Sequence, residues 1–185
     1  YMDCNSIIYD CIRELEKNSL LKPRISDNYQ NISSMVCSRI QSYIDNVQPS
    51  NVVFIAFDGV APMAKMCQQR VRRYKSAFTE PHFGTGALFG SCHITPGTQF
   101  MNYLSEFVSS HFRKCGNIIV SSANEPGEGE HKIFEALRQA PASTRLPGTV
   151  CVCSNDTDVV LGGLAAQPGE RCFSVASGGD NTLAM

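Results

Sequence analysis

The sequence lacks the features that mark membrane and secreted proteins. No stretch approaches the roughly 20 consecutive apolar residues that a membrane-spanning helix needs, and no charged, apolar, small-residue leader opens the chain. Its nine cysteines include no Cys-x-x-Cys pair. Scattered thiols in an odd number are typical of reduced core cysteines rather than of a disulfide framework. We therefore expect an intracellular protein in a reducing compartment, in the cytoplasm or the nucleus.

A strong net charge is also absent. The formal net charge is −1, which argues against the globally basic surface of many nucleic-acid-binding proteins. Five of the sixteen Lys and Arg residues nevertheless lie between positions 65 and 75, so a local basic patch is expected there. The 185 residues, with no internal repeat, are enough for one domain with a buried core.

The hydrophobic pattern predicts strands that alternate with helices. Short β-branched runs are typical of buried parallel strands, whereas apolar residues three and four positions apart indicate helices. The predicted strands are 1–3, 52–57, 117–121, 149–153 and 172–175. The predicted helices are 5–15, 28–47, one from Pro62, one from Thr95-Pro96 with Thr95 as its N-cap, and one that runs to Arg138. This order indicates an α/β fold with three layers around a mainly parallel sheet.

Acidic residues follow four of these predicted strands. Parallel strands present their carboxyl ends at one edge of a sheet, where ligands bind. Carboxylates gathered there would repel one another unless divalent cations lie among them. The six residues are Asp3, Asp58, Glu128, Glu130, Asp156 and Asp158. Oxygen ligands favour Mg²⁺ or Mn²⁺ over zinc, and a pair of such ions supports phosphate-ester hydrolysis, the chemistry of nucleases and phosphatases.

Two further features lie close to these acids. The helix from Pro62 carries four side chains that can donate hydrogen bonds: Lys65, Gln69, Arg72 and Arg73. Successive residues of a helix are 100° apart around its axis, and this spacing places the four within an arc of roughly 100°. Mixed donors on one face suit a terminal phosphate, although a solvated helix face is the alternative. His131 follows Glu130 without a zinc-protease spacing, so we expect a hydrogen bond at the helix start rather than a metal bond.

At these residues the sequence resembles the Xrn/Rat group of 5′ to 3′ exoribonucleases. Four stretches carry the resemblance, which spans the chain to Leu164: residues 1–8, 57–77, 94–101 and 126–133. The resemblance implies a PIN-like, flap-nuclease-like core in which the six acids are the catalytic Mg²⁺ ligands, with Mn²⁺ as a substitute. It implies that the four donors hold the 5′-monophosphate of single-stranded RNA, which is degraded to mononucleotides. Tyr9 stands where the family usually has a stacking His and keeps an aromatic face.

The same resemblance implies that residues 1–185 form a single, incomplete Xrn-type N-terminal nuclease domain. The family's short N-terminal segment and its second block are absent, so a protein partner that completes the fold is expected. Three alternatives stay open. They are a flap-endonuclease-like DNA nuclease, a catalytically impaired RNA-binding or interaction module, and a haloacid-dehalogenase-like phosphatase. The phosphatase needs a nucleophilic Asp two residues before Asp58, where this chain has Ala56.

Overall fold

The fold was analysed in a computed structural model. It describes residues 1–79, 89, 92–139, 150–154, 173–179 and 182–184. The helices are α1 (Asn5–Lys17), the 3₁₀ helix η1 (Ile25–Asn28), α2 (Tyr29–Val47), α3 (Met63–Thr79), α4 (Gln99–Phe112) and α5 (Gly129–Gln139). The strands are β1 (Met2–Asp3), β2 (Val53–Ala56), β3 (Ile118–Ser121), β4 (Val150–Cys153), β5 (Phe173–Gly179) and β6 (Thr182–Ala184). The predicted α/β class is confirmed.

The strands form one sheet in the order β3-β2-β1-β4-β5-β6. All neighbouring pairs are parallel except β5 and β6, which are antiparallel. β1 has only two residues, yet it lies in the middle, where Met2 pairs with Ile55 on one side and Cys153 on the other. The carboxyl ends of β1, β2, β3 and β4 therefore meet at the same edge of the sheet.

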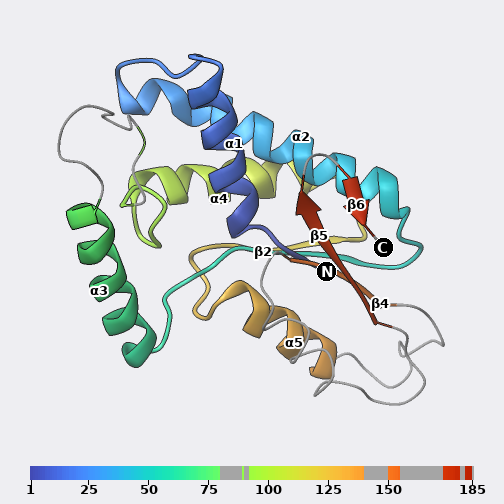
Figure 1. The fold of residues 1–185 in the computed structure, drawn as a ribbon. Helices are drawn as coiled ribbons and strands as arrows, with labels where there is room; N and C mark the ends of the chain where they lie inside the picture. The colour runs from blue at the N-terminus through green and yellow to red at the C-terminus, as the bar shows by residue number, and fades with distance from the viewer. Residues whose placement is uncertain (80–88, 90–91, 140–149, 155–172, 180–181, 185) are drawn as a thin grey trace.

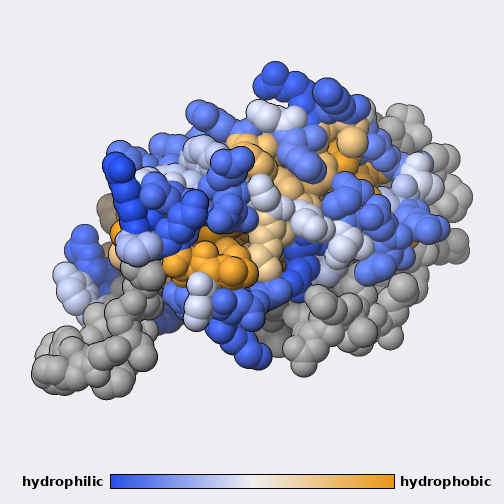
Figure 2. Space-filling view, turned by 90° about the horizontal axis from the view of Figure 1, so that it is seen from above, coloured by the Kyte–Doolittle hydropathy of each residue, from blue (hydrophilic) through white to orange (hydrophobic). Residues whose placement is uncertain are grey.

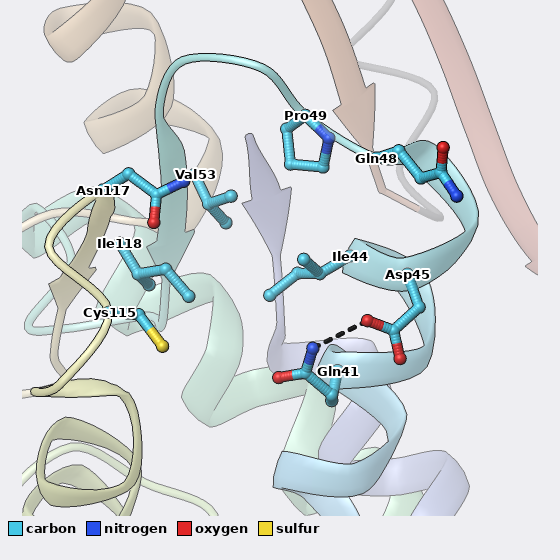
Figure 3. Close-up of a pocket in the computed structure, with 9 residues that line it drawn as sticks. All are labelled: Gln41, Ile44, Asp45, Gln48, Pro49, Val53, Cys115, Asn117 and Ile118. Atoms are coloured by element: carbon cyan, nitrogen blue, oxygen red, sulfur yellow. Dashed lines mark hydrogen bonds between the residues drawn. The ribbon is translucent and has the colours of Figure 1, made fainter.

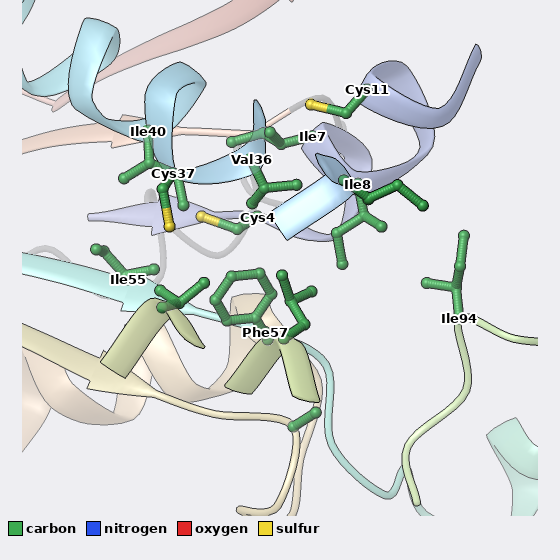
Figure 4. Close-up of a cluster of buried hydrophobic side chains, with 14 of the residues drawn as sticks. Cys4, Ile7, Ile8, Cys11, Val36, Cys37, Ile40, Ile55, Phe57 and Ile94 are labelled. Carbon is green, nitrogen blue, oxygen red and sulfur yellow. The ribbon is translucent and has the colours of Figure 1, made fainter. Parts of the chain in front are cut away.

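Helices cover both faces of the sheet, which makes the predicted three layers (Figure 1). α1, α2 and α4 lie on one face, and α5 lies on the other, where Ile133, Phe134 and Leu137 pack against Ala56 and Val152. The larger core fills the space under α1, α2 and α4 (Figure 4) and includes the fully buried Phe57. Figure 2 views the molecule from this side, where hydrophilic side chains cover most of the described surface. α3 stands apart from the helices on both faces of the sheet.

Two predicted element boundaries are wrong. The N-cap of α4 is Thr98 rather than Thr95, because Gly97, with φ +88°, turns the chain before the helix begins. The Thr98 hydroxyl accepts a 3.3 Å hydrogen bond from the backbone N–H of Met101. β5 continues to Gly179 instead of stopping at Val175, since β6, which the sequence analysis did not expect, pairs with residues 177–179. Pairing with β6 thus extends β5 through Gly178 and Gly179, two residues that indicate a turn when the sequence is considered by itself.

The cysteines of the described residues differ in burial, and Cys151 is partly buried. The thiols of Cys4, Cys11, Cys37 and Cys153 are buried, as expected of core cysteines. The prediction is wrong for Cys67, Cys92 and Cys115, which are exposed because they lie on α3 and in turns outside the layers. Within the described residues, no helix combines the length and the hydrophobicity that crossing a membrane requires.

Candidate metal centre

Asp3 and Asp58 are brought together by the parallel pairing of their strands. Asp3 ends β1 and pairs with Ala56, two residues before Asp58. The first residue of α5, Gly129, lies against both carboxylates. Its backbone N–H donates a 2.7 Å hydrogen bond to Oδ1 of Asp58, and a Cβ placed on it would lie 2.6 Å from Oδ1 of Asp3. Glycine thus leaves room for both carboxylates where they now lie, at a helix N-terminus whose dipole favours negative charge.

Asn5 holds Asp58 from the start of α1. Its side-chain Nδ2 donates to Oδ2 of Asp58 over 2.7 Å, and its Oδ1 accepts from the Asp58 backbone N–H over 3.0 Å. The amide therefore fixes both the backbone and the carboxylate of the same residue. The sequence analysis assigned Asn5 no role, since a polar residue at a helix start is common and its partner is 53 residues away.

Asp3 has one paired and one unpaired carboxylate oxygen. Ser154, directly after β4, donates to Oδ2 over 3.2 Å, whereas Oδ1 is buried without a hydrogen-bond partner among the described residues. Burial, followed by the negative charge of Asp58, raises the pKa of Asp3 to about 6. A buried carboxylate oxygen that lacks a donor and faces other carboxylates fits a site for a cation.

Glu128 and Glu130 extend the acidic group at the start of α5. Glu128 is buried, and its Oε1 lies 3.4 Å from Nζ of Lys65. Nδ1 of His131 lies 3.5 Å from Oε2 of Glu128 and 3.7 Å from Oε1 of Glu130. The ligand atoms of these three residues lie within 4.8 Å of one another, close enough to share a metal ion. The exposed His131 thus lies beside two carboxylates. The prediction for His131 was a hydrogen bond at the helix start and did not name these carboxylates as its neighbours.

Electrostatic interactions join these acids into one centre. Burial raises the pKa of Asp58, and the charge of Glu128 raises it further, while the Gly129 hydrogen bond and the positive charges of Lys132 and Lys65 lower it. Glu130 likewise raises the pKa of Asp3. The structure therefore gathers four predicted ligands: Asp3, Asp58, Glu128 and Glu130. Their oxygens are the donors that hard divalent cations prefer.

The last two predicted acids lie outside the described residues. Asp156 and Asp158 follow Ser154, the last described residue after β4. Ser154 already touches Asp3, so this strand also reaches the carboxyl edge of the sheet. The metal-binding roles of Asp156 and Asp158 stay predictions.

The predicted cationic face lies on α3, which contains Lys65, Gln69, Arg72 and Arg73. Lys65 and Gln69 are partly buried and Arg72 is exposed; the side chain of Arg73 lies outside the described ones. Lys65 links this face to the acidic centre through Glu128. Tyr9 is 37% exposed, one turn after Asn5 on α1. The contacts of these five residues with RNA stay predictions.

Lys132 is a buried cation that the sequence analysis missed. Its Nζ donates to the backbone carbonyls of Phe57 and Ser122, each over 2.8 Å. Burial lowers the pKa of its ammonium, while the carboxylates of Glu125 and Asp58 raise it. Nothing in the local sequence distinguishes this lysine from an exposed one on a helix.

An open pocket at the opposite edge of the sheet has a different character (Figure 3). It lies where β2 and β3 begin and α2 ends, and its lining includes Val53, Ile118 and Cys115. Asp45 in this pocket accepts a 2.8 Å hydrogen bond from Gln41. No group of predicted ligands lines the pocket, so the acidic edge is the candidate site.

A mainly parallel α/β sheet with carboxylates gathered beyond its strand ends defines an α/β protein with an acidic candidate centre for a cation. Comparison with known families identifies it further. The model described as "XRN 5'-3' exonuclease N-terminus" matches residues 1–175. The chain belongs to this family of PIN-like nuclease domains, as the resemblance predicted.

Curated relatives agree with this family. The chain is 35% identical over 198 residues to a 5'-3' exoribonuclease 2 homolog of Drosophila melanogaster, covering 89% of this chain and 21% of the relative. It is 35% identical to 5'-3' exoribonuclease 1 of Homo sapiens, covering 95% and 11% of the two chains. For 5'-3' exoribonuclease 1 of Saccharomyces cerevisiae the identity is 29%, covering 89% and 12%. The chain thus spans about a fifth or less of the length of these relatives.

Proposed function

We propose that this chain is the catalytic region of a 5′ to 3′ exoribonuclease. The observation that carries the proposal is the buried, unpaired Oδ1 of Asp3 among the carboxylates of Asp58, Glu128 and Glu130. The family and the names of its relatives support the same activity. None of the described contacts favours a phosphatase, a DNA nuclease or a binding module without activity.

The residues present fit Mg²⁺, with Mn²⁺ as a substitute. Asp3, Asp58, Glu128 and Glu130 supply carboxylate oxygens, and we propose that Asp156 and Asp158 complete the set. When bound, such ions activate a water and stabilise the leaving oxygen of a phosphoryl displacement. The chain's own contribution is to hold the ligands in place, through Asn5 and the Gly129 amide.

The substrate that we propose is single-stranded RNA with a 5′-monophosphate. Lys65, a member of the cationic face of α3, contacts the acidic centre, because its Nζ lies 3.4 Å from Oε1 of Glu128. A terminal phosphate on this face would place the first phosphodiester bond near the carboxylates. A positively charged, hydrogen-bonding surface of this kind suits a phosphate dianion. Tyr9 is proposed to stack on the first base.

Decay of matched RNAs tests this function. We expect the protein in Mg²⁺ to degrade a 5′-monophosphorylated RNA to mononucleotides, and to degrade the 5′-hydroxyl form at least tenfold more slowly. Asp58→Asn should reduce the rate by more than a hundredfold while RNA binding persists. Release of the terminal phosphate alone would indicate a phosphatase, equal decay of DNA a flap-nuclease-like enzyme, and intact RNA a binding module. Each of these three results contradicts the proposal.

A matched pair of arginine variants tests the phosphate site. Arg72 and Arg70 are both exposed on α3, and two helical positions separate them by roughly 160° around the axis. Arg72→Ala should remove most of the preference for the 5′-monophosphate, because it deletes one donor of the cationic face. Arg70→Ala should keep the preference. An unchanged ratio of the two decay rates in Arg72→Ala would rule out this role.

A further inference from the structure

Lys132 is buried in a way that lysines rarely are. Only 8% of its surface is exposed, and lysines are almost never buried unless their charge is paired or hydrogen-bonded. The ammonium donates two 2.8 Å hydrogen bonds, one to the carbonyl of Phe57 and one to that of Ser122. These acceptors are 75 and 10 residues away in the sequence, so the lysine joins separate segments of the chain.

The three segments that Lys132 joins carry or lead to three of the four acids of the centre, which are Asp58, Glu128 and Glu130. Phe57 directly precedes Asp58, Ser122 follows β3 in the loop that leads to Glu128, and Lys132 itself lies on α5 two residues after Glu130. The Lys132 backbone N–H also donates to the carbonyl of Glu128 over 3.0 Å. One side chain thus links the ends of β2 and β3 to the start of α5.

A second, independent contact joins the loop after β2 to the loop between β3 and α5. The Gly59 N–H donates to the Gly127 carbonyl over 2.8 Å, and the Gly127 N–H donates to the Val60 carbonyl over 2.9 Å. The loops are so close that a Cβ on Gly59 would lie 1.7 Å from the backbone oxygen of Glu125. Asp58 lies between this glycine pair and the carbonyl that Lys132 holds.

We propose that Lys132 is a positioning residue of the metal centre, which holds Asp58 at a fixed place relative to Glu128 and Glu130. Hydrogen bonds to two backbone carbonyls restrain the backbone on which Asp58 stands, while Asn5 and Gly129 orient its carboxylate. Residues that orient the ligands of a metal typically change its affinity 10- to 100-fold when they are removed. This inference rests on the proposed function, since it assigns Lys132 to the same centre.

Mn²⁺ binding without RNA tests the inference directly. Lys132→Met keeps the apolar stem but removes the donors, and Lys114→Met, at an exposed lysine outside the site, is the matched control. We expect Lys132→Met to bind Mn²⁺ about 10- to 100-fold more weakly, with an altered Mn²⁺ electron paramagnetic resonance spectrum. With 5′-monophosphorylated RNA, kcat should fall while KM stays within about twofold, because the ligands shift and the phosphate face does not.

Gly59→Ala provides a second variant that does not depend on the lysine. Its added methyl group pushes the same loops apart from the other side, so it should weaken Mn²⁺ binding and lower kcat in the same way. If Lys132→Met does not fold, Lys132→Leu, which also lacks the donors and suits a buried helix position, is measured in its place. Wild-type Mn²⁺ affinity in a folded Lys132→Met or Lys132→Leu protein would overturn the inference, while the proposed function would stand. A different pair of results would separate the two proposals. If these variants bind Mn²⁺ more weakly than the wild type, but the wild type leaves RNA intact, the inference is supported and the proposed function is contradicted.

Discussion

Asp3 illustrates how its neighbours set the chemistry of a single carboxyl group. Burial and the charge of Asp58 raise its pKa from 3.8 to about 6. Between these two values the folded protein binds more protons than the unfolded chain. The free energy of unfolding of the metal-free protein should therefore fall as the pH rises through this range. One pKa unit corresponds to about 1.4 kcal/mol, so we expect Asp3 to contribute a loss of about 2–3 kcal/mol.

Urea denaturation in EDTA, at several pH values from about 4 to 7, measures this contribution. Asp3→Asn is the control, because it keeps the shape of the side chain and has no carboxyl proton. The difference between the two proteins isolates Asp3 from the other acids of the site. Parallel stability curves for the wild type and Asp3→Asn would show that Asp3 does not titrate in this range.

Asn5 carries a second prediction for a single residue. Asn5→Ala removes both hydrogen bonds between Asn5 and Asp58, and the carboxylate then loses one of the two groups that orient it, with the Gly129 amide remaining. We expect Mn²⁺ affinity to fall about tenfold, as measured by calorimetric titration of the RNA-free protein. Asn31→Ala, at an exposed position of α2, should leave the affinity unchanged. Equal affinities of Asn5→Ala and the wild type would contradict the role of Asn5.

The sequence predicted the acids of the site but not the residues that hold them. Asp3, Asp58 and the two glutamates follow strand ends, and parallel strands bring such ends together whatever lies between them. Asn5, Ser154 and Lys132 act through contacts with partners 53, 151 and 75 residues away. Their roles depend on which strands are neighbours and in which register, and hydrophobic periodicity does not carry that information.

The elements show the same division between local and distant causes. The strands 53–56, 118–121 and 150–153 and the helix 5–17 lie where the hydrophobic pattern predicted them, because each places apolar residues against the core. β3 is less buried than its β-branched run predicted, since it is an edge strand on which Ile119 is 52% exposed. The start of α4 was misplaced by three residues. Thr95-Pro96 has the residue types of a helix start, but the turn at Gly97 moves the first helical residue to Gln99.

The start of α4 gives a prediction that separates the two threonines. The Thr98 hydroxyl caps the helix, whereas Oγ1 of Thr95 is buried without a hydrogen-bond partner in the described structure. Substitution by valine removes the hydroxyl and keeps the shape. Thr98→Val should lower the free energy of unfolding by about 1 kcal/mol, and Thr95→Val should leave it unchanged or raise it. Chemical denaturation of both variants checks this, and the opposite order would restore Thr95 as the cap.

At the scale of the whole molecule, the fold places its two kinds of charge next to each other. The sheet collects carboxylates at one edge, α5 closes that edge with the Gly129 amide, and α3 stands beside it with Lys65 touching Glu128. The positions of the charged side chains thus determine the character of this edge more than the net charge of −1 does. A nearly neutral chain thus carries an acidic cluster and a basic helix face side by side.

The acidic edge predicts that the stability of the whole protein depends on divalent cations. A ligand that binds only the folded state raises the free energy of unfolding, by about 2.7 kcal/mol at a concentration 100 times its dissociation constant. We expect Mg²⁺ to stabilise the protein, and more at pH 8 than at pH 5, because protons compete for the carboxylate of Asp3 below its pKa of about 6. Thermal unfolding with Mg²⁺, or with NaCl at equal ionic strength, measures the effect. Asp58→Asn should lose most of it, and the same Mg²⁺ stabilisation in this variant and the wild type would place the cation elsewhere on the molecule.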